Sequence, residues 1–116
     1  MAIDTRTQLH DYLVDLAKSG RTATYSQAAS SVGLDMRRGA DANAFVAMLK
    51  AISEAEHKEG RPLLSAVCVL PGVKRPGQAF FELARSLGLP GADGDNREFH
   101  AAELARVHAY WSGSAS

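Results

Sequence analysis

The chain has 116 residues, of which 46% are apolar and 22% charged, and this size and balance fit one globular domain with one core. Its 13 basic and 13 acidic residues give a formal net charge of zero, which argues against attachment to nucleic acid by bulk charge but leaves a local basic patch open. The one cysteine excludes an internal disulfide and favours a reducing compartment.

The terminal segments and the apolar runs bear on the expected location of the protein. The N-terminal segment MAIDTRTQLH lacks the apolar stretch of a secretory signal, and the longest apolar run, residues 62–71, is far shorter than a membrane span. The C-terminal residues SGSAS offer nothing to bury. We therefore expect a soluble cytoplasmic protein with one domain over residues 1–111 and a flexible tail over residues 112–116.

The first predicted helix starts at Thr5. Thr5 and Gln8 have the spacing of a capping box, in which a hydroxyl at the helix start is followed three residues later by Glu or Gln. Apolar residues then recur with helical periodicity from Leu9 to Ala17. Gly20 ends the helix, because glycine accepts the left-handed backbone that closes it.

A short strand and two helices are predicted next. Residues 21–25, RTATY, are short and partly β-branched, which favours a brief strand. Ser26 offers an N-cap and Gly33 a C-cap for a helix of about two turns between them. A long helix follows from Asp41 and stops at Gly60. Its apolar stripe consists of Phe45, Met48, Leu49, Ile52 and Ala55.

The region after the long helix combines a predicted core strand with a basic bend. Residues 63–70, LLSAVCVL, are apolar without alternation and lie between two prolines, which favours a strand covered on both faces. Residues 71–77, PGVKRPG, form an exposed turn. Residues 78–87 fit either a further helix or a second strand, since their periodicity does not decide between them. On a helix, Phe80 and Phe81 cannot face the same way, so we expect one to be buried and the other to cover a neighbour or a partner chain.

The last predicted helix follows Asp95, which has capping-box spacing with Glu98. The protein is thus predicted to be mainly α with a small β component, made of five helices, one or two short strands and one core strand. A helix, a short strand, two helices, a strand and a turn follow one another in the order of a winged helix. In that fold the second of the paired helices enters the DNA major groove and a hairpin loop contacts the backbone.

Residues 20–34, GRTATYSQAASSVGL, resemble the start of the DNA-binding domain of alkyltransferase-like proteins and O6-alkylguanine methyltransferases. The shared pattern is threonine-tyrosine followed by an alanine-rich short helix that ends at glycine. It is carried here by Thr24, Tyr25, Ala28 and Gly33. The resemblance implies a DNA-binding fold of the helix-turn-helix type. It implies no alkyl transfer, because those methyltransferases hold their acceptor cysteine in a Pro-Cys-His-Arg stretch, whereas Cys68 stands between two valines.

Two pairs of cations are predicted to contact phosphates. Arg37 and Arg38 would lie just before the recognition helix and Lys74 and Arg75 at the tip of the wing, so that the two pairs straddle a nucleic-acid backbone. Asn43, early in the recognition helix, would face the bases. The leading hypothesis is therefore a small nucleic-acid-binding or regulatory module. Exposed dibasic turns also serve solubility alone, which is the alternative for Lys74 and Arg75.

Cys68 is either a nucleophile or a small buried core residue. Its apolar neighbours favour the core, because they supply no cation or base that would form a thiolate. The histidines have no metal-binding spacing, and no cofactor, metal or catalytic residue is predicted. A second hypothesis is a self-associating interaction domain, based on the neutral charge, the Phe80–Phe81 pair and the aromatic C-terminal helix. A third is an enzyme or ligand-binding protein with a cleft near Cys68 and His108.

Overall fold

The computed structural model describes residues 4–113. Its five α-helices are α1 (Thr5–Lys18), α2 (Tyr25–Ser31), α3 (Gly39–Lys58), α4 (Gln78–Ser86) and α5 (Asn96–Gly113). The strands β1 (Ala23–Thr24) and β2 (Cys68–Val69) form a two-stranded parallel sheet, and the 3-10 helix η1 (Leu64–Val67) directly precedes β2. The prediction of a mainly helical protein with a small strand component is confirmed.

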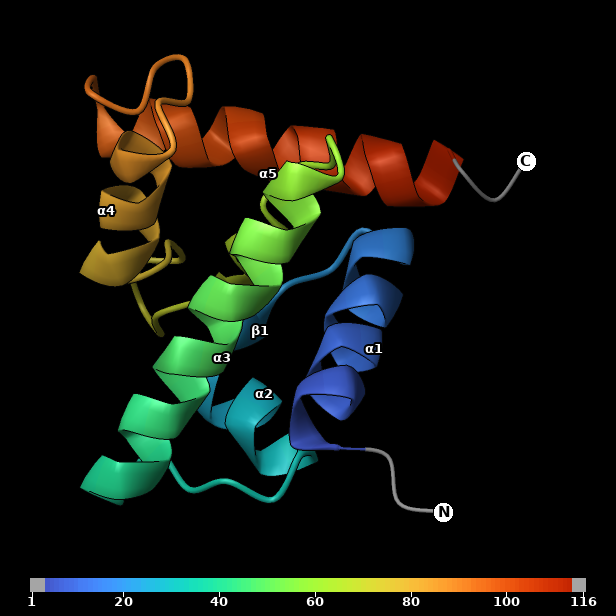
Figure 1. Cartoon of the computed structure of the whole chain (residues 1–116), viewed down its shortest axis with the longest axis vertical. Coiled ribbons are helices and arrows are strands. Elements are labelled where there is room, and N and C mark those ends of the chain that lie inside the picture. The colour runs from blue at the N-terminus through green and yellow to red at the C-terminus, as the bar shows by residue number, and fades with distance from the viewer. Residues whose placement is uncertain (1–3, 114–116) are drawn as a thin grey trace.

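The centre of the core is the segment that contains η1. This segment packs against α1, α3 and α5. Its fully buried residues are Leu63, Leu64, Ala66, Val67 and Cys68. Around it, α3 runs diagonally across the molecule with α1 on one side and α4 on the other, and α5 lies across the ends of these helices (Figure 1). Within residues 4–113, no helix combines the length and the apolar character needed to cross a lipid bilayer.

Helix α1 begins where it was predicted, but its cap is a different residue. The Asp4 carboxylate accepts a hydrogen bond from the Thr7 N–H at 2.8 Å, so Asp4 and not Thr5 is the N-cap. The predicted apolar stripe is confirmed, because Leu9, Leu13, Leu16 and Ala17 are all buried. Gly20 follows the helix with φ +69°, as its predicted role requires.

The N-cap predicted for α2 at Ser26 is wrong. Thr24 caps this helix: its hydroxyl accepts from the Gln27 N–H at 3.1 Å, and the Gln27 side chain accepts from the Thr24 N–H at 2.9 Å. Thr24 is also the last residue of β1, so the chain passes from strand to helix with no linker. Gly33, with φ +81°, follows the helix C-cap, in agreement with the prediction that it ends α2.

The core strand predicted over residues 63–70 is wrong for most of its length. Only Cys68 and Val69 are in a strand, where they pair with Ala23 and Thr24, and the preceding residues form η1. Side chains from other helices, which the local sequence does not reveal, supply the backbone partners that a neighbouring strand would otherwise provide.

Two of these partners come from α3 and α5. The Leu63 N–H donates to the Glu103 carboxylate at 2.7 Å. The Ser65 N–H donates to Ser53 Oγ at 3.1 Å, and the two serine hydroxyls are 2.7 Å apart. With these two N–H groups satisfied by side chains, the segment stays buried without joining a larger sheet.

Residues 78–87 resolve in favour of the helical alternative, α4. The expectation that only one of Phe80 and Phe81 is buried is wrong, since each is 5% exposed. Their rings meet edge to face at 5.1 Å, and Phe80 also lies 6.0 Å from Phe99 of α5. Helix α4 therefore buries more than one face.

Helix α5 starts with the predicted cap, because the Asp95 carboxylate accepts from the Glu98 N–H at 3.0 Å. The helix includes Ser112 and Gly113, the first two residues of the segment predicted as a tail. The rest of that segment lies outside the described residues.

Candidate functional site

The segment between β2 and α4, residues 70–77, is a closed loop at the surface, called the basic bend below. The Leu70 N–H donates to the Arg75 carbonyl at 2.7 Å, and the Lys74 N–H donates to the Leu70 carbonyl at 3.1 Å. Lys74 adopts φ +57°, a left-handed conformation that residues with a Cβ rarely take. The loop backbone thus holds Lys74 in an exposed position by hydrogen bonds at its base.

Three cations, two from this loop and one from α5, line a single hollow and are called the cation cluster below. Lys74 and Arg75 line one surface hollow together with Arg97 from the start of α5 and with His100. No carboxylate is among the described residues that line this hollow. Within residues 4–113, no member of the cation cluster forms an ion pair. The cluster therefore keeps its positive charge available for an external anion.

His100 forms the inner wall of the same hollow. It is 5% exposed, and its Nε2 lies 2.9 Å from the Ala66 carbonyl, to which it donates. Burial lowers the pKa of His100, and the positive charge of Arg75 acts in the same direction. At neutral pH the imidazole is therefore uncharged, and it fixes α5 against η1 instead of adding a fourth charge.

The cations predicted before α3 are arranged differently. The Arg37 guanidinium donates to both carboxylate oxygens of Asp35 at 3.1 Å, which lowers the pKa of Asp35 and raises that of Arg37. Arg37 lines a separate hollow with Ser26 and Ser30 of α2. Arg37 thus has a carboxylate partner, in contrast to the cation cluster.

Arg38 and Asn43 are both exposed at the start of α3. Arg38 is the N-cap residue of α3, but its side chain makes no capping bond. The structure therefore brings Lys74 and Arg75 together with Arg97, and it places Arg37 in a different hollow.

Cys68 has the surroundings of a core residue. It is fully buried, and burial raises the pKa of its thiol to about 12. His108, which was proposed to share a cleft with it, has its Nε2 3.3 Å from the carbonyl of Arg21. At neutral pH the thiol stays protonated, which agrees with the favoured interpretation of Cys68 as a core residue and gives no support to the alternative of a nucleophile.

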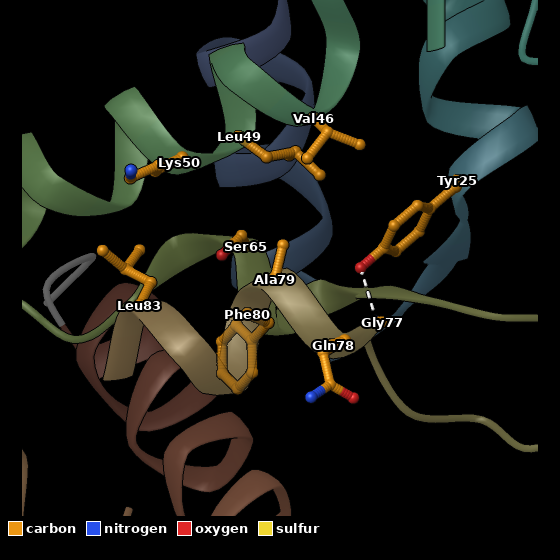
Figure 2. A pocket seen from close by; sticks show the side chains of 10 residues that line it. All are labelled: Tyr25, Val46, Leu49, Lys50, Ser65, Gly77, Gln78, Ala79, Phe80 and Leu83. Carbon is orange, nitrogen blue, oxygen red and sulfur yellow. Dashed lines mark hydrogen bonds between the residues drawn. The ribbon is translucent and has the colours of Figure 1, made fainter. Parts of the chain in front are cut away.

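A cavity of about 180 Å³ lies between α3 and α4. Figure 2 shows Val46 and Leu49 on the α3 side and Ala79 and Phe80 on the α4 side. Tyr25, from the start of α2, stands at one side of the cavity, and its hydroxyl accepts from the Gly77 N–H at 2.8 Å (Figure 2). Burial raises the pKa of Tyr25, so its hydroxyl is protonated at neutral pH.

Sequence reasoning missed one residue of the cation cluster and one hydrogen bond beside the cavity. Arg97 has no periodic or motif signal, because its role depends on how α5 packs against the basic bend. The hydrogen bond from Gly77 to Tyr25 joins residues 52 positions apart, and nothing local in either segment indicates it.

Comparison of the chain with protein-family models, with curated proteins and with solved structures finds no match.

Proposed function

We propose that the protein is a small nucleic-acid-binding module whose contact surface is the basic bend and the start of α5. The observation that carries this proposal is the cation cluster of Lys74, Arg75 and Arg97, which has no ion pair within residues 4–113 and no carboxylate among the residues that line its hollow. Cations in this state replace the counterions of a phosphate backbone, and that exchange supplies affinity that is independent of sequence.

Within this proposal the fold is winged-helix-like, with α2 and α3 as the paired helices. The order of α1, β1, α2 and α3, followed by β2 and the basic bend, supports this assignment. So does the resemblance of residues 20–34 to the DNA-binding domain of alkyltransferase-like proteins.

Two features differ from a standard winged helix, and they determine which residues we assign to the main phosphate contacts. The sheet is parallel, and residues 32–38 connect α2 to α3, whereas the turn of a helix-turn-helix has about three or four residues. We therefore assign the main phosphate contacts to the cation cluster. Arg38 and Asn43 are assigned supporting contacts from α3, and Arg37 a weaker one because Asp35 holds it.

Fluorescence anisotropy with a short labelled duplex and a labelled single strand, over a range of salt concentrations, tests the proposal. The variant Lys74→Ala/Arg75→Ala/Arg97→Ala should bind more weakly than the wild type. The slope of log K against log salt should become shallower by about 0.9 for each duplex phosphate contact that is lost.

The matched control is Lys18→Ala/Lys58→Ala/Arg85→Ala, which removes the same charge from exposed residues outside the hollow. It should keep most of the wild-type affinity and slope. Equal losses in both variants would mean that only total charge matters, and no binding by the wild type at low salt would remove the proposal.

Self-association stays a prediction. Phe80 and Phe81 no longer support it, because both are buried, and its remaining aromatic basis is Tyr110, which is 42% exposed. Sedimentation of the wild type over a concentration series, before nucleic acid is added, measures it. A monomer at every concentration would contradict self-association and leave the nucleic-acid proposal intact.

A further inference from the structure

The cavity between α3 and α4 has the size of a site for one small ring. Its volume of about 180 Å³ is close to that of a cavity of about 150 Å³, lined by apolar side chains, that is known to accommodate benzene. Val46, Leu49, Phe80 and Leu83 provide apolar walls from two facing helices (Figure 2). Such apolar walls fit the face of a single ring.

The polar side chains around the cavity include the donors of Lys50 and Tyr25 and the amide of Gln78, which can both donate and accept. The Tyr25 oxygen accepts from the Gly77 N–H, and its O–H can still donate to a further acceptor. The Lys50 ammonium has no ion pair within residues 4–113. Ser65 is already engaged, because its hydroxyl lies 2.7 Å from that of Ser53. No Asp or Glu is among the described residues that line the cavity.

The charge of Lys50 favours one sign of charge on a ligand. An ammonium group at the edge of an apolar space, without a carboxylate nearby, favours an anion and disfavours a cation of the same shape. We propose that the cavity binds a small molecule with one apolar ring and a carboxylate, the ring lying between α3 and α4 and the carboxylate facing Lys50. The site is separate from the cation cluster, and the proposal does not depend on nucleic-acid binding.

Tyr25 and Gly77 make the cavity a preformed site. Their hydrogen bond joins the start of α2 to the residue that precedes α4, and the Tyr25 ring lies 6.1 Å from Phe45 of α3. A wall that is fixed in the free protein loses little conformational entropy when a ligand binds.

Two-dimensional amide NMR of the whole chain, titrated with phenylacetate, tests the proposal. We expect saturable shifts in residues 46–50 and 77–83. The probes 2-phenylethanol and phenethylamine have the same ring and nearly the same size, and they should bind progressively more weakly than phenylacetate.

Two substitutions separate the ring from the charge. Ala79→Leu adds bulk at an exposed position of the cavity wall and should abolish the shifts, whereas Ala102→Leu, a change at an exposed position of α5, should leave them intact. Lys50→Met keeps the length of the apolar stem and removes the ammonium group. It should weaken the binding of phenylacetate about tenfold while leaving the binding of 2-phenylethanol unchanged.

Each result decides the proposal. Absence of saturable shifts with phenylacetate would overturn it, as would shifts that Ala79→Leu does not reduce, because the ligand would then bind elsewhere. Equal affinity for the three probes, or no effect of Lys50→Met, would overturn the assignment of an anionic ligand.

Discussion

Replacing Tyr25 with phenylalanine removes the oxygen that connects the start of α2 to the residue that precedes α4. That oxygen accepts the Gly77 N–H at 2.8 Å, across 52 residues of sequence. The phenylalanine ring would keep the packing that the tyrosine ring has 6.1 Å from Phe45, so the substitution isolates the hydrogen bond from the apolar contact. Tyr25→Phe therefore measures how strongly this single bond holds two distant segments together.

The expected loss follows from the burial of the two groups. A neutral hydrogen bond contributes about 0.5–1.5 kcal/mol net, and leaving a buried donor without a partner costs about 1–3 kcal/mol. Tyr25 and Gly77 are both half-buried, so water reaches the freed N–H in part. We expect Tyr25→Phe to lower the free energy of unfolding by about 1–2 kcal/mol. For a domain of this size that corresponds to a fall in Tm of roughly 3–10 °C.

Urea unfolding followed by circular dichroism measures this loss, with an unchanged m value showing that the unfolded state is not affected. The rate of amide hydrogen exchange should also increase more at Gly77 and Gln78 than at other residues. Tyr12→Phe, on the half-buried face of α1, is the control, because no hydrogen bond is found for the Tyr12 hydroxyl in the described residues. If the two variants lose the same stability to within about 0.5 kcal/mol, the bond does not hold the segments together.

Three further predictions concern buried polar groups. Cys68 should react with a thiol reagent at neutral pH only as fast as the protein opens, because burial raises its pKa to about 12; labelling in folding buffer and in urea compares the two states. Burial lowers the pKa of His100 below its ordinary 6.5, so in acid the unfolded chain binds more protons than the folded chain. The free energy of unfolding should therefore fall as the pH drops through about 6.5. Urea unfolding from pH 7 to 5 measures this dependence, which His100→Gln should flatten. Glu103→Ala should lower the free energy of unfolding by about 1–3 kcal/mol because it leaves the Leu63 N–H unpaired. Glu103→Gln should lower it less, because the amide oxygen still accepts from that N–H. Similar losses in the two variants would show that the charge of Glu103, and not this hydrogen bond, matters.

The helices were predictable because their signals are local. The apolar spacing of α1 and α3 and the cap at Asp95 lie within a few residues of the structure they specify. The prediction of a strand over residues 63–70 failed because a run of apolar residues is as typical of a strand covered on both faces as of the buried segment observed. Its actual conformation depends on Glu103 and Ser53, which lie 40 and 12 residues away along the chain.

The candidate site shows the same division between local and distant information. The exposure of Lys74 follows from the prolines and glycines around it, and the sequence predicts it correctly, whereas Arg75 is half-buried against the hollow. The pairing of Arg37 with Asp35 is also local, because the two residues are two positions apart, and it makes Arg37 a weaker candidate for the proposed phosphate contacts. Arg97 joins the cation cluster only through the packing of α5, so it could not be predicted from the sequence.

The zero net charge of the chain is compatible with a binding surface for anions, because the charges are not evenly distributed. Buried Glu56 and Glu103 hold Arg61 and Arg106 in ion pairs, so these arginines contribute little to the field outside the molecule. The cation cluster has no such partner among the described residues. In physiological salt the field of a charge decays over about 8 Å, so a nearby phosphate responds to the local cluster and hardly to the sum over the chain. The proposed nucleic-acid binding therefore does not require a basic net charge, provided that the cation cluster itself stays unpaired.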